Sequence, residues 1–159
     1  WTTRFGAETS VHLQDFIAAP ADWADAALIE KWKRVRELRR VVTGALELQR
    51  ADKKIGSSLE AAPTLVLEDR ADADIVQDVA FAEVAITSGF AVILGGSTPE
   101  DFRLPDVPRA AARFARAAGE KCARCWMVLP EVAAHPATHL CNRCTEAVAA
   151  LTSRQGELA

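Results

Sequence analysis

The sequence predicts an α+β protein with three successive parts: a long N-terminal amphipathic helix, a small α/β junction unit, and a C-terminal knuckle that carries four cysteines. Three observations lead to this expectation. Apolar residues recur every three or four positions between residues 28 and 48. Short aliphatic runs separated by turn residues follow between residues 64 and 118. Two C-x-x-C pairs then stand close to the end of the chain.

The long helix is predicted to begin after Asp22, with Asp25 three positions later supporting its first turn, and to run to about Lys54. Gly56 stops the pattern, and residues 1–20 show no clear period. One apolar stripe is expected along the helix, formed by Leu28, Trp32, Val35, Leu38, Val42, Ala45 and Leu48.

The same helix is rich in cations. They are Lys33, Arg34, Arg36, Arg39, Arg40, Arg50, Lys53 and Lys54. A charged run on an amphipathic helix is usually its solvated face, and that is the interpretation we favour. The alternative is an electrostatic footprint for the backbone of a polyanion.

The middle of the chain is predicted to be α/β. Ser57 and Glu60 have the spacing of a capping box, which indicates one short turn. Asp72 or Asp74 is expected to cap a short helix that ends near residue 79. The predicted strands are 64–68, 82–87, 90–94 and 110–118, the last with Arg113 facing outward.

We therefore expect a division into residues 1–62, 63–119 and 120–159, with a short helix over 146–151 closing the chain. The chain begins with Trp1 instead of Met, which suggests a piece of a longer protein. The net charge of −3 excludes a globally basic nucleic-acid binder but leaves room for local basic faces. No apolar run approaches bilayer length and no signal peptide opens the chain, so we expect no membrane partner and a cytoplasmic location.

The four cysteines predict a zinc site. Two C-x-x-C pairs with fifteen residues between them suit a tetrahedral Zn²⁺ ion, with Cys122, Cys125, Cys141 and Cys144 as ligands. Four thiolates close the tetrahedron, which favours one structural ion over a catalytic one. Disulfides are the alternative, and His135 and His139 between the pairs are expected to be solvated loop residues.

Polar and aromatic residues run through this zinc module. Lys121, Arg124 and Arg143 stand beside the cysteines, and Trp126 follows the first pair. Cations around an exposed Trp can hold phosphate and stack a base. Equally, Trp126 could pack under the metal while the cations balance the thiolates. The chain has no P-loop, nucleophile elbow or catalytic triad pattern, so it is not expected to catalyse a reaction alone.

Two stretches resemble the C-terminal region of bacterial-type isoleucyl-tRNA synthetases. One is Gly-Glu-Lys-Cys-Ala-Arg-Cys-Trp at 119–126 with Leu-Cys-Asn-Arg-Cys at 140–144. The other is Arg-Ala-Asp-Lys-Lys-Ile-Gly-Ser-Ser-Leu-Glu-Ala at 50–61, which is similar to the end of the family's helical anticodon-binding domain. The segment 65–118 matches only by position and α+β character.

The resemblance implies a fragment of a synthetase that charges tRNA(Ile) with isoleucine using ATP, with the catalytic parts elsewhere in the parent enzyme. It implies that the zinc module helps to hold the anticodon arm through Lys121, Arg124, Trp126 and Arg143, and that the protein is a monomer. Zinc fingers of formamidopyrimidine-type DNA-repair glycosylases are similar in their cysteine pairs and form the alternative. They tend to have Gly where this chain has Trp126, and their Pro-Glu nucleophile is absent. A purely structural zinc-stapled domain is a third possibility.

Overall fold

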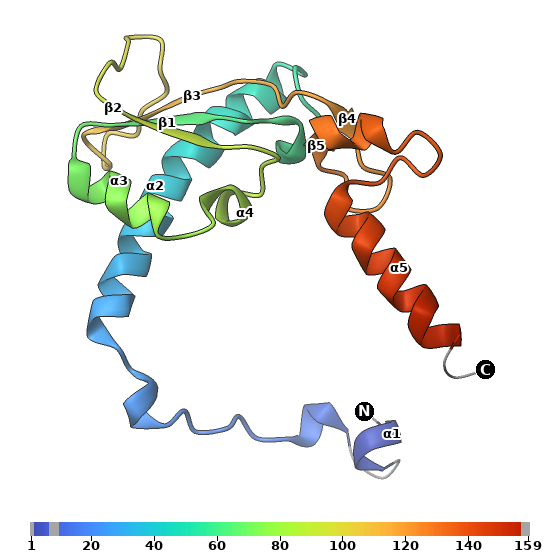
Figure 1. Cartoon of the computed structure of the whole chain (residues 1–159). Helices are drawn as coiled ribbons and strands as arrows, with labels where there is room; N and C mark the ends of the chain where they lie inside the picture. The colour runs from blue at the N-terminus through green and yellow to red at the C-terminus, as the bar shows by residue number, and fades with distance from the viewer. Residues whose placement is uncertain (1, 7–9, 157–159) are drawn as a thin grey trace. The chain divides into compact units, whose positions relative to one another are not determined.

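The computed structural model describes residues 2–6 and 10–156 (Figure 1). The chain divides into two units, Trp1–Glu30 and Lys31–Ala159. This boundary falls within the long helix, and the three-part division expected from the sequence stays a prediction. Over the described residues, no helix is both long and apolar enough to cross a membrane.

The first unit has little regular structure. It contains the short helix α1 (Thr2–Phe5) and two single 3₁₀ turns, η1 (Val11–Leu13) and η2 (Ala21–Trp23). Large apolar side chains in it, including Phe16 and Ile17, are exposed. The absence of a periodic pattern before residue 20 agrees with this irregular backbone.

Helix α2 (Ala26–Ala51) is the long helix that the apolar spacing predicts. Asp25 caps it, because its carboxylate accepts a hydrogen bond from the Leu28 N–H at 2.9 Å, so the expectation that Asp22 begins the helix is wrong. The helix also ends slightly earlier than expected, since Lys53 adopts a left-handed φ of 57°.

Only the middle of the predicted apolar stripe is buried. Val35, Leu38, Val42 and Ala45 are in the core, together with Val41 and Leu46, which the stripe did not include. Leu28, Trp32 and Leu48 are exposed. The buried stretch is therefore shorter and wider than a strict three-and-four spacing indicates.

A three-stranded mixed sheet follows α2. Its central strand β1 (Thr64–Leu67) pairs in parallel with β2 (Ala91–Leu94) and antiparallel with β3 (Ala110–Arg113). These strands confirm three of the predicted ones. Before β1, the 3₁₀ turn η3 (Ser58–Glu60) has the full capping box that its sequence indicates.

One face of the sheet forms the core with the helices. Leu65 and Leu67 of β1 and Ala110 and Ala112 of β3 belong to the same buried cluster as the apolar residues of α2. Figure 1 shows α3 (Arg70–Gln77) and α4 (Phe81–Ala85) beneath the strands, with α2 running diagonally past them. The alternation of side chains along each strand directs these residues to one face.

Two expectations in this region are wrong. The predicted strand 82–87 is α4, because Phe81 and Ala85, four residues apart, bury one helical face in the core. Helix α3 is capped by Asp69, whose carboxylate accepts from the Ala71 N–H at 2.9 Å, and not by Asp72 or Asp74. Asp72 is inside the helix and is buried.

Candidate zinc centre and nucleic-acid interface

The first C-x-x-C pair is held by a short hairpin. Strand β4 (Glu120–Lys121) pairs antiparallel with β5 (Val128–Leu129), and the pair of cysteines lies in the connection between them. The Trp126 N–H donates to the Cys122 carbonyl at 3.0 Å, which closes the turn. Trp126 has a φ of 67°, a left-handed conformation that is uncommon for a bulky residue.

Gly119 is required at the entrance of this hairpin. Its φ of 109° is a conformation that side chains with a Cβ atom rarely adopt, and an added Cβ atom would lie 2.3 Å from the carbonyl carbon of Leu129. In the sequence, Gly119 is only the first residue of the motif at 119–126. The close approach between two backbone segments, which gives the glycine its role, is visible only in three dimensions.

The second C-x-x-C pair begins helix α5 (Asn142–Gly156). This helix confirms the predicted closing helix but begins before residue 146, because Cys141 and Cys144 bracket its first turn. The two halves of the knuckle are joined directly: the Ala123 N–H donates to the His139 carbonyl at 2.8 Å, and the Cys141 N–H donates to Cys122 Sγ at 3.3 Å.

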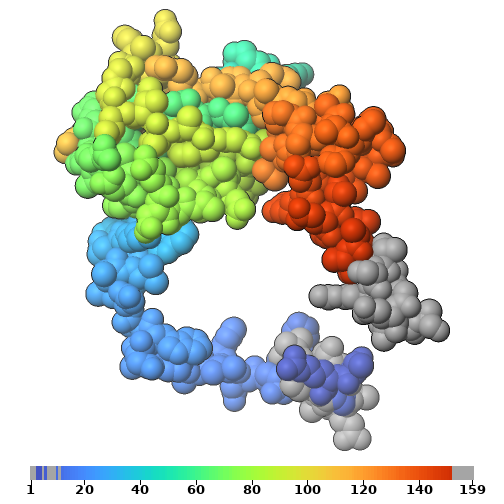
Figure 2. Space-filling view, viewed as in Figure 1, coloured from blue at the N-terminus to red at the C-terminus, as the bar shows by residue number. Residues whose placement is uncertain are grey.

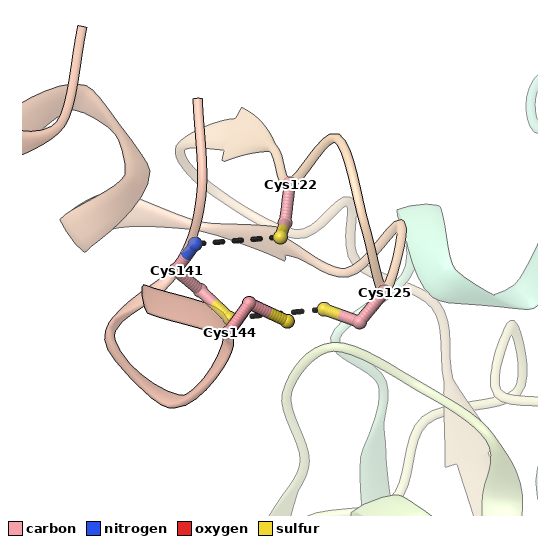
Figure 3. A group of neighbouring side chains, drawn as sticks. All are labelled: Cys122, Cys125, Cys141 and Cys144. Atoms are coloured by element: carbon pink, nitrogen blue, oxygen red, sulfur yellow. Dashed lines mark hydrogen bonds between the residues drawn. The ribbon is translucent and has the colours of Figure 1, made fainter. Parts of the chain in front are cut away.

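The four cysteine sulfurs form one group. Figure 3 shows the side chains pointing toward a common centre, and their sulfur atoms all lie within 4.8 Å of one another. The Cys125 and Cys141 sulfurs are 3.7 Å apart. A tetrahedron with Zn–S bonds of about 2.3 Å has edges of about 3.8 Å, so the arrangement fits one zinc ion. None of the four cysteines forms a disulfide in this structure, and their arrangement favours metal binding over the disulfide alternative.

Burial and hydrogen bonding act in opposite directions on these thiols. Burial raises the pKa of Cys122, but backbone N–H groups of Cys125, Cys141 and Arg124 lower it more, and the resulting pKa is about 6. Burial and neighbouring sulfurs raise the pKa of Cys141 to about 12. Neighbouring thiolates repel one another in this buried place, and a divalent cation removes that cost.

The residues around the sulfurs point outward. Trp126 is 61 % exposed, so it does not pack under the metal, and Val132 is the buried aliphatic residue of the cluster instead. The Lys121 ammonium lies 5.6 Å from the centre of the Trp126 ring. Arg124 and Arg143 are also exposed.

Both arginines are linked to the cysteines. Arg124 Nη1 lies 3.7 Å from Cys144 Sγ. Interaction with the Cys125 thiolate raises the pKa of the Arg143 guanidinium. Each cation therefore stands next to sulfur and still reaches solvent. The predicted residues Lys121, Arg124, Trp126 and Arg143 all lie at the surface of the knuckle.

The two loop histidines are outside the sulfur cluster, as expected. His135 Nε2 lies 2.8 Å from Asn142 Oδ1, which ties the loop to the start of α5. His139 is exposed and lies 3.8 Å from the Glu120 carboxylate. Neither replaces a cysteine in the group of possible ligands.

Ser88 attaches the cysteine knuckle to the sheet unit, by which we mean strands β1–β3 and the helices packed against them; the two parts are in contact (Figure 2). The Ser88 hydroxyl donates to the Leu59 carbonyl at 2.5 Å and accepts a hydrogen bond from the Val128 N–H at 2.7 Å. In the sequence, Ser88 lies between the predicted strands 82–87 and 90–94. No local pattern marks it, since its partners are 29 and 40 residues away along the chain.

Several cations of α2 are paired with carboxylates from other parts of the chain. Arg34 donates to both carboxylate oxygens of Asp72, at 2.7 and 2.5 Å, and this hydrogen bonding raises the pKa of Arg34. Lys31 pairs with Asp78 and Arg40 with Asp106. Part of the basic run therefore pairs with acidic residues that follow it in the sequence, so these cations contribute to the fold as well as to the solvated face that we favoured.

Comparison with known proteins extends beyond the knuckle. Residues 119–147 match a family described as the zinc finger found in FPG and IleRS. Over 136 residues, 86 % of its length, the chain is 48 % identical to isoleucine–tRNA ligase from Brucella abortus (strain 2308). The resemblance to isoleucine–tRNA ligases is confirmed. Isoleucine–tRNA ligases from Mesorhizobium japonicum and Ruegeria pomeroyi are 48 % identical over 141 residues and 44 % identical over 149 residues.

The similarity to isoleucine–tRNA ligases supports a C-terminal region of such an enzyme. The chain spans 14 % of the Brucella and Mesorhizobium ligases and 15 % of the Ruegeria ligase. The finger family alone covers both FPG and IleRS proteins and does not separate them. The match to isoleucine–tRNA ligases also covers residues outside the finger, and the repair-glycosylase alternative is therefore less supported. The finger match and the four-sulfur cluster together support one structural zinc ion.

Proposed function

We propose that this chain is the C-terminal tRNA-binding part of an isoleucine–tRNA ligase. The rest of the parent synthetase would then carry isoleucine activation with ATP and transfer to tRNA(Ile). What supports this is the similarity to isoleucine–tRNA ligases over most of the chain. A cytoplasmic location and a monomeric state belong to the same proposal, and the isolated chain is expected to have no ligase activity.

In this proposal the four cysteines hold zinc as a scaffold. Cys122, Cys125, Cys141 and Cys144 are the ligands, which fills all four tetrahedral positions and leaves none for water or substrate. When bound, zinc supplies cross-linking between the hairpin and the start of α5. The chain's own contribution is to position Lys121, Arg124, Trp126 and Arg143 on the outside of that scaffold.

The observation that carries the proposed contact face is the exposure of Trp126 beside a cation. The backbone holds its ring outward in a left-handed conformation, 61 % exposed, although a large aromatic side chain usually gains more by burial. An exposed ring can stack on an unpaired base, and Lys121, Arg124 and Arg143 can contact the neighbouring phosphates. Bases of an anticodon loop are unpaired and therefore suit such a surface.

Binding of fluorescent tRNA(Ile) to the whole zinc-loaded chain tests the proposal. Replacement of Trp126 by Ala should weaken binding about tenfold, since stacking on one base contributes about 1–3 kcal/mol. Trp23→Ala is the matched control, because Trp23 is 75 % exposed and lies in the other unit of the chain. Equal affinities for the two variants would contradict the proposed contact face and favour a purely structural zinc module.

A second measurement examines the cations. Arg124→Gln and Arg143→Gln should each weaken binding and reduce its dependence on salt, because each lost phosphate contact lowers the number of counterions released. Zinc content of each variant, measured after dialysis, separates lost contacts from a lost scaffold. Full zinc content with unchanged tRNA affinity would contradict the role of these arginines.

A further inference from the structure

An open cavity of about 180 Å³ lies beside α2 in the sheet unit. Arg39 and Arg50 of α2, Ser58 of η3 and Ile86 at the end of α4 are among the residues that line it. Leu46 and Ala85, which are both buried, also border it and make part of its surface apolar. Two arginines and a hydroxyl next to an apolar surface suit a ligand with an anionic group attached to a less polar body.

Arg39 is positioned differently from its neighbours on α2. Its Nε atom donates to the Val84 carbonyl at 2.7 Å, which fixes the plane of the guanidinium group. Among the residues that the structure describes, no carboxylate lies within ion-pair distance of Arg39, whereas Arg34 and Arg40 are paired with Asp72 and Asp106. The charge of Arg39 therefore has no carboxylate partner among these residues, and its two terminal nitrogens are available for a forked contact with an anion.

Arg50 and Ser58 complete the polar side of the cavity. Arg50 is 41 % exposed and is paired with Glu47, an exposed ion pair that contributes little to stability. Glu47 is also the one acidic residue that lines the cavity, so its lining carries a net positive charge. The Ser58 hydroxyl has no hydrogen-bond partner within the described part of the chain, which leaves it free to donate to a ligand.

Arg50 and Ser58 both belong to a stretch, residues 50–61, that the zinc site does not explain. Residues 50–61 were singled out in the sequence, yet none of them is part of the sulfur cluster. The end of α2 and the turn that follows bring Arg50 and Ser58 to the same cavity. At its rim Ile86 is 53 % exposed and has a left-handed φ of 58°, which is unfavourable for a β-branched side chain.

We propose that this cavity binds a backbone phosphate of RNA, with Arg39 and Arg50 on the phosphate oxygens, Ser58 donating a hydrogen bond, and the ribose against Ile86. This inference rests on the proposed tRNA-binding function and adds a second contact on the sheet unit, separate from the zinc knuckle. A phosphate group fits the forked donors of Arg39, and the apolar border excludes water from one side of the contact.

The site itself is tested with inorganic phosphate and the whole zinc-loaded chain. In ¹⁵N-resolved NMR spectra, phosphate should shift backbone amides of residues 39–50, 58 and 85–86, relative to chloride at equal ionic strength. Arg50→Gln should weaken this phosphate binding at least about fivefold, because a charge-assisted contact is lost. Arg70→Gln is the matched control: it removes an exposed arginine that also pairs with a carboxylate one helical turn away.

RNA binding is measured in parallel as the slope of log affinity against log salt concentration for tRNA(Ile). Arg50→Gln should reduce the magnitude of this slope by about 0.7–0.9, the value for one phosphate contact, while Arg70→Gln leaves it nearly unchanged. Absence of phosphate-specific amide shifts in the wild-type chain would overturn the site. If the wild-type chain binds tRNA, equal salt slopes for Arg50→Gln and Arg70→Gln would overturn the proposed RNA contact.

The two proposals can fail independently. Phosphate-specific shifts that Arg50→Gln abolishes, with no tRNA binding by the wild-type chain, would establish an anion site and refute the proposed function. Binding of tRNA that responds to Trp126→Ala but not to Arg50→Gln would support the function and overturn the second contact.

Discussion

Replacement of Gly119 by Ala should disable the zinc knuckle while leaving the sheet unit folded. Two costs follow from the structure. The φ of 109° is strained for alanine, at about 1–3 kcal/mol. The new Cβ atom would also lie 2.3 Å from the Leu129 carbonyl carbon and 2.4 Å from the Pro130 nitrogen, so β5 must move away from β4, at about 1–3 kcal/mol more. The sum is about 4 kcal/mol.

This cost should be observed as a loss of zinc affinity, because zinc binding and folding of the knuckle are the same free-energy change. About 4 kcal/mol corresponds to an affinity nearly a thousandfold lower. Competition between the protein and a chromophoric zinc chelator measures the ratio directly, with Co²⁺ absorption as an independent measure of four-sulfur coordination.

Gly95→Ala is the matched control. Gly95 also has a positive φ, of 69°, but no atom lies within 4 Å of the added Cβ position. It should cost about 1 kcal/mol of stability and leave zinc affinity unchanged. Zinc affinity of Gly119→Ala within threefold of the wild-type value would refute the argument, since the close backbone approach would then impose no cost.

Three further outcomes are expected. Removal of zinc by a chelator should expose residues 120–145 to proteolysis while α2 stays helical, and unchanged proteolysis would contradict a structural ion. Ser88→Ala should lower the free energy of unfolding by about 1–3 kcal/mol, because the Val128 N–H loses its hydrogen-bond partner. The control Ser97→Ala, at an exposed position, should leave the free energy of unfolding unchanged. Hydrogen bonding from Arg113 holds the pKa of buried Asp101 at about 2, below the value in the unfolded chain. The ionised Asp101 carboxylate therefore stabilises the folded state above about pH 4, and this stabilisation is lost as the pH falls toward 2. Thermal melts of Asp101→Asn at pH 7 should show a loss of about 2 kcal/mol that shrinks toward pH 2, and a loss independent of pH would contradict this origin.

Local patterns in the sequence were sufficient for several elements. The capping box of Ser57 and Glu60 forms, β1, β2 and β3 lie where aliphatic runs indicate, and the paired cysteines meet. Each of these depends on neighbouring residues or on fixed ligand spacing. The strand predicted for residues 82–87 was wrong because the outcome depends on contacts with distant residues. Val84 and Ile86 favour a strand, but burial of Phe81 and Ala85 against the core stabilises a helix.

The same limit applies to the charged residues. The run of cations on α2 is plain in the sequence, but its meaning depends on acids that are 38 to 66 residues away along the chain, such as Asp72 and Asp106. Only folding shows which cations are paired and that Arg39 is bound to a carbonyl group instead. A list of charges cannot distinguish these cases, because an ion pair depends on distance in space.

Four cysteines in two C-x-x-C pairs are enough to predict the zinc site, because residue type and spacing specify both the ligands and their geometry. The relationship to isoleucine–tRNA ligases is likewise recognisable from sequence motifs. The folded chain was needed to see that Trp126 faces solvent, that Gly119 allows two backbone segments to touch, and that Ser88 attaches the knuckle to the sheet unit. Exposure, close approach and long-range hydrogen bonds arise from residues far apart in the chain, and no local pattern encodes them.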